Sequence, residues 1–149
     1  MDNTLHMIGL AMKAGRLEVG EEPVGQSCRE KRCRLLLTAS DAAEGSLRRA
    51  EHFAGEGACL LVGVPFSREE LGGAVGRASC AMAAVTDLGL AQAIAGKLAA
   101  ADPERYQETV ERLRVKAARA AQRRERTAGE RKQRQSGKPR APAKKYRKK

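Results

Sequence analysis

The sequence predicts an α/β fold, a three-layer α/β/α sandwich, and two observations lead to this prediction. Short apolar runs without strict polar alternation recur along the first hundred or so residues, which is typical of strands buried on both faces. Segments with helical apolar spacing and helix-capping residues lie between these runs. Strands and helices that alternate in this way pack as a sheet covered by helices on both faces.

The first elements are expected to be a helix, a short strand and a second helix. Apolar residues at 5–12 supply one helical face, and Gly15 stands where a left-handed helix cap is expected. Residues 16–19 form a strand candidate. A second helix is expected to open at Gly20 and to run to about Lys31, because acidic residues and proline favour a first helical turn.

Two further strands enclose a third helix. Residues 35–37 are three consecutive leucines, and residues 59–64 form another apolar run that is closed by Pro65. Between them, Ser40 and Asp41 together with Gly45 and Ser46 supply turn and capping chemistry for a helix through residue 53.

The remaining elements of the sandwich are a short helix, a strand and a longer helix. Ser67 and Glu70 have the spacing of a capping box, and the helix that follows is expected to stop in the glycine-rich segment 71–76. Residues 80–85 predict the last strand. Thr86 or Asp87 is expected to cap a helix through residue 98.

Charge divides the chain into two parts. Residues 1–101 carry 11 Lys or Arg against 12 Asp or Glu, a net charge of −1, whereas residues 102–149 carry 18 against 6, a net charge of +12. We therefore expect a folded domain over residues 1–101 and a basic extension over residues 102–149. The extension would add sequence-independent attraction to phosphates, and the alternative is a solvated tail that only aids solubility.

The basic extension is expected to begin as a helix. Asp102 and Pro103 form a helix start, and apolar residues follow at three-to-four spacing from Tyr106 to Ala117, after which the apolar stripe fades. Residues 134–149 contain eight Lys or Arg and no acid, with prolines that break regular structure. This tail is expected to be disordered when free.

Cysteine spacing predicts neither a metal site nor disulfides. Cys28, Cys33, Cys59 and Cys80 show no C-x-x-C pattern, and neither histidine stands near them in a ligand pattern. We expect no metal and no cofactor, with the thiols reduced and packed as small apolar groups. An acid at residue 2 and the lack of an 18-residue apolar run predict no signal peptide, no membrane partner and a cytoplasmic protein.

Patterns typical of enzymes are not found. The sequence has no G-x-G-x-x-G or Walker pattern after a strand, no H-E-x-x-H cluster and no histidine placed beside a nucleophile. Ser40 with Asp41 is better explained as a turn at a strand end than as a catalytic pair. Four scattered phenylalanines and tyrosines are too few for a base-stacking sheet, so binding to nucleic acid would use loops.

The segment around Gly20 is the strongest candidate binding loop. Here a helix end and a short strand lead to Gly20, which opens a second helix that bears Glu21 and Glu22. This arrangement presents the N-terminal amides of the helix and two acidic side chains to a polar partner, which we take to be folded RNA. The alternative is that both acids only cap the helix.

Motifs in a fixed order resemble a known family. They are G-L-A at 9–11, K-A-G at 13–15, G-E-E at 20–22, L-L-L-T-A-S-D at 35–41, E-L-G at 70–72, Ala74, Gly76 and A-V-T-D at 84–87. Over residues 4–100 this order resembles the kink-turn-binding ribosomal protein family of the L-seven-Ae type, and most of all its small bacterial YlxQ-like paralogues. The resemblance implies a sandwich around a mixed four-stranded sheet, with two neighbouring loops that grip a kinked RNA helix.

The resemblance also implies a set of site residues. The first loop, 20–26, would place backbone amides and polar side chains against sheared G·A pairs; Glu22 stands where the strongest binders carry asparagine, Pro23 where they carry glutamate and Gln26 where they carry lysine. The second loop, 76–79, would hold a flipped-out nucleotide beside Arg77. Arg16 and Arg29 are cations near the first loop, and Glu44 stands near the place of a third polar contact in the family. The candidate RNA-binding residues are therefore Arg16, Gly20, Glu21, Glu22, Gln26, Arg29, Glu44, Arg77, Ala78 and Ser79.

The expected function is therefore RNA binding without catalysis. The sequence predicts a monomeric ribosomal or ribosome-associated protein that recognises kinked structured RNA, such as ribosomal RNA, through two loops, while the tail binds phosphates. One alternative is a general polyanion-binding accessory protein. Another is the substrate-recognition module of an RNA-modifying enzyme, although the 48 mostly charged residues after the sandwich cannot build a catalytic domain.

Overall fold

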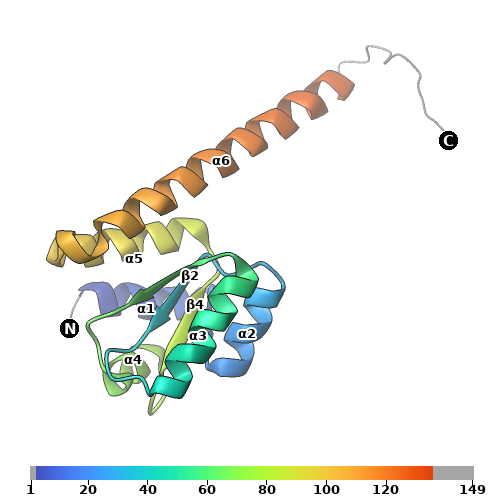
Figure 1. The fold of residues 1–149 in the computed structure, drawn as a ribbon. Coiled ribbons are helices and arrows are strands. Elements are labelled where there is room, and N and C mark those ends of the chain that lie inside the picture. The colour runs from blue at the N-terminus through green and yellow to red at the C-terminus, as the bar shows by residue number, and fades with distance from the viewer. Residues whose placement is uncertain (1–2, 136–149) are drawn as a thin grey trace. The chain divides into compact units, whose positions relative to one another are not determined.

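The computed structural model describes the backbone of residues 3–135 and the side chains of residues 3–129. Helices and strands alternate along the first hundred residues, as Figure 1 shows. In chain order the elements are α1 (Asn3–Lys13), β1 (Leu17–Val19), α2 (Glu21–Arg29), β2 (Leu35–Thr38), α3 (Glu44–Gly57), β3 (Leu60–Gly63), α4 (Arg68–Val75), β4 (Met82–Val85), α5 (Leu88–Ala101) and α6 (Pro103–Gln135).

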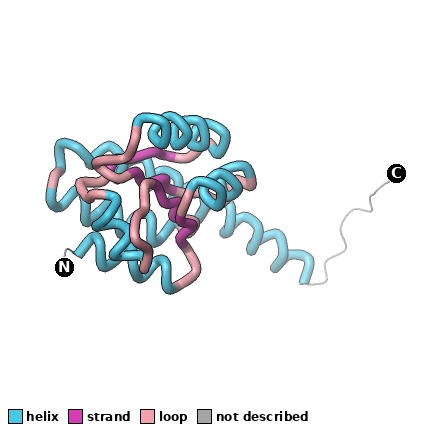
Figure 2. The backbone as a smooth tube through the Cα atoms, turned by 90° about the horizontal axis from the view of Figure 1, so that it is seen from below, coloured by secondary structure: helices cyan, strands magenta, loops and turns pink. Residues whose placement is uncertain are grey.

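The four strands form one mixed sheet in the order β1-β4-β2-β3. The last strand, β4, lies between β1 and β2 and is antiparallel to both, whereas β2 and β3 run parallel. Figure 2 shows the strands inside a shell of helices. The predicted three-layer sandwich with a mixed four-stranded sheet is confirmed.

Helices cover both faces of the sheet and bury two apolar cores. Successive strand residues point to opposite faces, so Leu35 and Leu37 join one core and Leu36 joins the other. The larger core lies against α1, α4 and α5, and the smaller one lies against α2 and α3, which run side by side in Figure 1. The smaller core contains two of the four cysteines, Cys28 and Cys33.

One strand is less buried than its sequence predicts. Every residue of β2 and β4 is buried, as expected of continuous apolar runs. The run that forms β3 is equally apolar, yet Leu61 is 36% exposed and only Val62 of this strand is buried. The difference arises because β3 is an edge strand, and the position of a strand in the sheet is not encoded in its own composition.

Three of the predicted helix caps are present. Gly15 adopts a left-handed conformation (φ 72°) after α1. Ser67 and Glu70 form the full capping box at the start of α4. Of the two candidates before α5, Asp87 is the cap, since its Oδ2 accepts from the Leu90 amide at 2.9 Å.

The predicted capping of α3 is wrong. The helix begins at Glu44 after Ala43, which offers no side-chain cap, and it continues one turn beyond the predicted end, to Gly57. Asp41 instead accepts from the backbone amide of Arg68 at 2.7 Å. Asp41 is expected from the sequence to cap α3, the next helix along the chain. It instead binds the first amide of α4, because the fold brings the loop after β2 beside the start of that helix.

The compact sandwich ends later than charge alone predicts. It extends to Arg114 rather than to residue 101, and a second unit begins at Val115. Tyr106 and Leu113 in the first turns of α6 are 1% and 0% exposed. The Tyr106 hydroxyl donates to the carbonyl of Gly63 at 2.8 Å, and burial raises the pKa of this phenol. The part of α6 that carries the predicted apolar stripe, up to Arg114, therefore packs as part of the sandwich.

The second unit continues α6 as a charged helix to Gln135. The predicted disordered tail beyond that point lies outside the described residues. No helix in the described part of the chain is both long enough and apolar enough to span a bilayer.

Replacing Tyr106 with alanine is expected to lower the free energy of unfolding by about 3–5 kcal/mol, because the change leaves a cavity in the core. Tyr106→Phe removes only the hydrogen bond to Gly63 and should cost about 1 kcal/mol. Gln107→Ala, on the exposed side of the same helix, is the matched control and should change stability by less than about 0.5 kcal/mol. Urea unfolding measures all three, and equal effects at residues 106 and 107 would contradict the docking of this turn.

Candidate nucleic-acid interface

Three loops meet at one end of the sheet. The amide of Gly20, which follows β1, donates to the carbonyl of Met82 at 3.3 Å. The amide of Ala39, which follows β2, donates to the carbonyl of Ala81 at 3.0 Å. Both acceptors, Ala81 and Met82, stand at the start of β4, two to three residues after loop 76–79. The two candidate loops predicted from sequence therefore lie next to the loop that leads into α3.

Gly20 turns the chain from β1 into α2. Its φ of 99° lies in the region that only glycine adopts readily, and it caps the helix without a side chain. Its carbonyl accepts from the Val24 amide at 3.1 Å, and Pro23 has no amide hydrogen to offer. The remaining amides of the first turn, those of Glu21 and Glu22, are the donors that this helix end presents to a ligand.

The two acids of the first turn differ in their surroundings. The Glu21 carboxylate is bound by α3: its Oε1 lies 2.6 Å from Arg49 Nε, and its Oε2 accepts from the Ser46 hydroxyl at 3.3 Å. Glu22 is exposed, and no hydrogen bond or ion pair of its carboxylate occurs among the described residues. The structure thus gives Glu21 a role in joining α2 to α3 and leaves Glu22 open to a partner.

Gln26 lies on the exposed side of α2, more than a turn beyond Glu21. Its Nε2 donates to Oε2 of Glu30 at 3.0 Å, and this hydrogen bond is the largest cause that lowers the pKa of the Glu30 carboxyl. The Gln26 side chain is exposed, so a ligand can compete for it.

The second loop folds tightly back on α4. Gly76 ends that helix in a left-handed conformation (φ 76°), and the Arg77 amide donates to the carbonyl of Gly72 at 2.7 Å. A Cβ at Gly72 would lie 2.7 Å from the Arg77 carbonyl oxygen and 2.8 Å from the Ser79 nitrogen. The close approach requires glycine there, and it leaves the side chains of Arg77, Ala78 and Ser79 exposed.

Glu44 is the exposed first residue of α3, and it follows the loop that is bonded to Ala81. Seven predicted site residues consequently lie in the three loops at this end of the sheet or in the first turns of the helices that leave them. They are Gly20, Glu21, Glu22, Glu44, Arg77, Ala78 and Ser79.

Two predicted site residues lie at the opposite end of the sheet. The carbonyl of Arg16 accepts from the Thr86 amide at 2.9 Å, beyond the far ends of β1 and β4. Arg29 ends α2, a helix that begins at the loops. Both side chains are exposed, yet the length of one strand or one helix separates them from Gly20.

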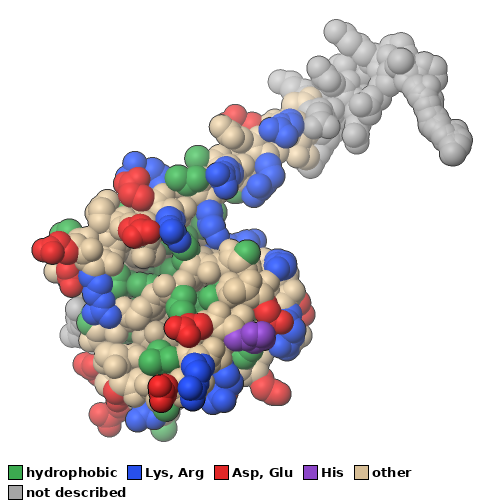
Figure 3. Space-filling model, viewed as in Figure 1, with side chains coloured by type: hydrophobic (Ala, Val, Ile, Leu, Met, Phe, Trp, Pro, Cys, Tyr) green, Lys and Arg blue, Asp and Glu red, His purple; other side chains and the backbone are tan. Residues whose placement is uncertain are grey.

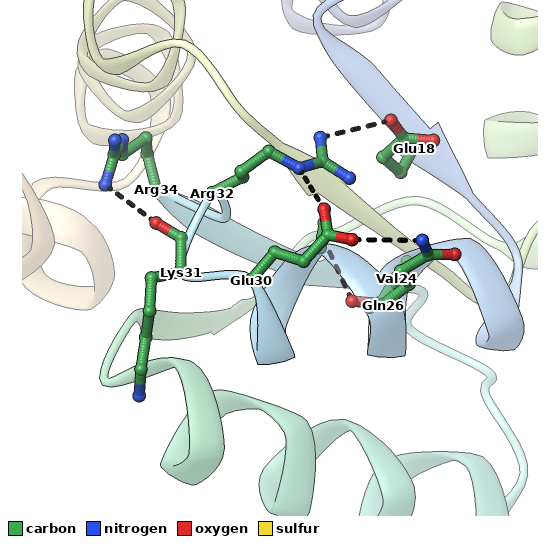
Figure 4. A network of polar contacts seen from close by, with 8 residues as sticks. Glu18, Val24, Gln26, Glu30, Lys31, Arg32 and Arg34 are labelled. Carbon is green, nitrogen blue, oxygen red and sulfur yellow. Dashed lines mark hydrogen bonds and ion pairs between the residues drawn. The ribbon is translucent and has the colours of Figure 1, made fainter.

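Further cations gather around the end of α2, and part of their charge is neutralised within the protein. Figure 4 shows Arg32 between two acids, 2.7 Å from Glu30 and 3.6 Å from Glu18. The hydrogen bond to Glu30 raises the pKa of the Arg32 guanidinium. Arg34 instead donates to the backbone carbonyl of Lys31 at 3.3 Å. The contact between Arg32 and Glu18 joins two segments of the chain and is not apparent from the sequence.

Charge does not separate into wide patches on the face of the sandwich that Figure 3 shows, where acidic and basic side chains are interspersed. A nearly neutral body agrees with the net charge of −1 counted over residues 1–101. The loops themselves carry exposed side chains of both charges, Glu22 and Glu44 against Arg77, and so offer little long-range attraction for phosphates.

The chain matches no protein-family model and no curated protein. It is similar in structure to a protein of unknown function from Bacillus halodurans C, with 26% sequence identity and a TM-score of 0.61; the match covers 66% of this chain and 98% of that one. It is also similar to the Giardia lamblia 15.5kD RNA binding protein, with 16% identity and a TM-score of 0.52, over 73% of this chain and 85% of that one. An RNA-binding protein therefore has the fold observed here.

Gly72→Ala is expected to displace loop 76–79 and to lower stability by about 1–3 kcal/mol, because the added methyl group meets the loop backbone. Gly73→Ala is a matched control on the same helix, since a Cβ there meets nothing within 4 Å, and it should be neutral or stabilising by up to about 1 kcal/mol. Thermal unfolding and the amide chemical shifts of residues 76–79 measure both effects. Similar results for the two variants would show that the loop does not depend on this contact.

Proposed function

We propose that the protein binds kinked, structured RNA, as a ribosomal or ribosome-associated component, through the loops that open α2 and precede β4. The observation that carries this proposal is that Gly20, Ala39 and the loop before β4 meet at one end of the sheet. The Giardia RNA-binding protein with the same fold supports RNA as the partner. Recognition through two adjacent loops agrees with the family resemblance of the sequence.

The exposed groups at this end suit the edges of unpaired or sheared bases. The Glu22 carboxylate accepts hydrogen bonds from guanine nitrogens, and the first-turn amides of α2 donate to phosphate or base oxygens. Arg77 either stacks on a splayed base or binds a phosphate. Glu21 acts in this proposal as a positioning residue, because its carboxylate already holds Arg49 and Ser46.

Affinity in this proposal comes largely from the basic extension. Its described side chains at 115–129 include five Lys or Arg and a single acid, Glu125. Such a helix neutralises RNA phosphates without reading sequence. The same observation favours the alternative, a general polyanion-binding accessory protein, in which the sandwich makes no selection.

We propose further that the protein acts by stabilising a bent RNA conformation and catalyses no reaction. The body selects the shape of the RNA, and the extension tightens the complex. Under this proposal the protein works as a cytoplasmic monomer.

A fragment of residues 1–114 is expected to retain preference for kinked RNA over a straight duplex of equal length, although both bind more weakly than to the full chain. This fragment keeps Tyr106 and Leu113, which complete the core, whereas a fragment ending at residue 101 would lose them. Fluorescence titration of both RNAs measures the ratio of dissociation constants. Equal affinities for the two RNAs would support the polyanion-binding alternative.

Salt is expected to act mainly on the full chain. If the extension neutralises on the order of six phosphates, its affinity should fall about a thousandfold between about 50 and 200 mM salt. The 1–114 fragment should show a much smaller slope, since its body is nearly neutral. Equal salt slopes for fragment and full chain would contradict this division of roles.

Arg77→Ala in the 1–114 fragment is expected to weaken binding of kinked RNA about tenfold, a loss of about 1.4 kcal/mol. Arg16→Ala removes the same charge from the opposite end of the sheet and serves as the matched control, with an effect below about twofold. The same titration measures both variants. Equal losses would show that general charge, rather than the loop, determines binding.

A further inference from the structure

Three cysteines from two segments of the chain meet beneath the C-terminal ends of α2 and α3. Cys28 lies in the last turn of α2, Cys33 precedes β2 and Cys59 follows α3. Their three sulfur atoms all lie within 4.8 Å of one another. Cys28 and Cys33 are 0% and 3% exposed, whereas Cys59 is half-buried and borders the surface.

Close packing of the two helices produces this cluster. A Cβ at Gly57, the last residue of α3, would lie 3.0 Å from the carbonyl oxygen of Cys28 and 3.1 Å from its Cα. Glycine at this position therefore lets the end of α3 pack against the backbone of Cys28 more closely than a side chain would allow without a shift. The Cys59 amide is itself fixed, since it donates to the carbonyl of Ala54 at 3.1 Å.

The turns that carry the cysteines have unusual backbone conformations. Among the described residues, Lys31 (φ 61°) and Ala58 (φ 52°) are the two non-glycine positions with positive φ. Ala58 immediately precedes Cys59, and Lys31 stands two residues before Cys33. Ala58 is the left-handed C-cap of α3 and Lys31 follows the end of α2, so both conformations end a helix and turn the chain toward a cysteine.

The geometry suits a small thiophilic cation. Zinc bound by thiolates has Zn–S distances of about 2.3 Å, which places the sulfurs of a tetrahedral site about 3.8 Å apart. The three sulfurs of the cluster, all within 4.8 Å of one another, lie close to that spacing. The half-buried position of Cys59 leaves access for an ion and for a water molecule as fourth ligand.

Burial and mutual hydrogen bonds raise the pKa values of the two buried thiols of the cluster. Burial, with Cys59 as the next cause, raises the pKa of Cys28 to about 11. The hydrogen bond with Cys59 is the largest cause that raises the pKa of the Cys33 thiol above its usual range.

We propose that Cys28, Cys33 and Cys59 form a binding site for a thiophilic metal ion with a filled d shell, Zn²⁺ or Cu⁺. When Zn²⁺ binds, three Zn–S bonds form, three thiol protons pass to solvent and no electron is transferred. The zinc with its three thiolates carries one negative charge. Lys31, whose ammonium donates to the carbonyl of Glu56 close to Cys59, offsets that charge.

Sequence spacing predicted no metal because no two cysteines have a C-x-x-C pattern, a rule that applies to ligands contributed by one short turn. Here Cys28 and Cys33 stand five residues apart at the end of α2, and Cys59 comes from a second segment after α3. A bound ion would join the C-terminal ends of α2 and α3, whose N-terminal ends are already joined by Glu21 and Arg49. It would thereby stiffen the helix that begins at the candidate RNA-binding loop, without contacting RNA itself.

Zinc titration of the reduced, metal-free full chain against a competing chromophoric chelator tests this proposal. We expect one Zn²⁺ per chain and a loss of affinity of at least about a hundredfold in Cys59→Ser, because a direct ligand is removed. Cys80→Ser is the matched control: Cys80 is a buried cysteine of the other core, whose thiol donates to the Met82 carbonyl, and its substitution should leave zinc affinity unchanged. Circular dichroism establishes that both variants fold.

Cd²⁺ gives a second readout, because cadmium thiolates absorb in the ultraviolet and the band should disappear in Cys59→Ser and Cys59→Ala. Binding of Cu⁺ in preference to Zn²⁺, with the same dependence on Cys59, also supports the site. No stoichiometric binding of either ion by the wild-type chain would overturn the proposal. Equal zinc affinities in Cys59→Ser and Cys80→Ser, or a disulfide between two of the three cysteines in protein isolated without oxidation, would overturn it as well.

Discussion

The pairing of β4 with both β1 and β2 is the constraint on which the rest of this structure depends. Because β4 is antiparallel to each neighbour, the residues that follow β1 and β2 come to the same sheet end as the residues that precede β4. Gly20 and Ala39 are held there by bonds to Met82 and Ala81. A candidate site from three loops follows from strand order alone, before any side chain is considered.

Helices α2 and α3 are fastened at both ends by different chemistry. At the loop end, Glu21 pairs with Arg49, a solvent-exposed contact that contributes at most about 1 kcal/mol and mainly fixes orientation. At the other end, Gly57 packs on Cys28 and brings three thiols together. The position of the first turn of α2, which presents Glu22, therefore depends on packing a full helix length away.

Charge is divided along the chain rather than across the surface of the sandwich. Acids within the body form ion pairs with its cations, as Glu18 and Glu30 do with Arg32. The excess positive charge of the extension has few such acids beside it. A body that discriminates by short-range hydrogen bonds and an extension that attracts by long-range electrostatics make separable contributions, since only the second is strongly screened by salt.

The sequence by itself determined the order and type of the elements, because apolar periodicity, capping at Ser67 and Asp87 and the left-handed glycine at 15 are local properties. Tertiary structure alone decided the exposure of β3 at the sheet edge and the docking of Tyr106 on Gly63. It also decided which predicted site residues share one end of the sheet and placed Arg16 and Arg29 at the other end. The meeting of Cys28, Cys33 and Cys59 is likewise a result of tertiary structure. These features are contacts between segments distant in sequence, and their partners are set by strand order and helix packing.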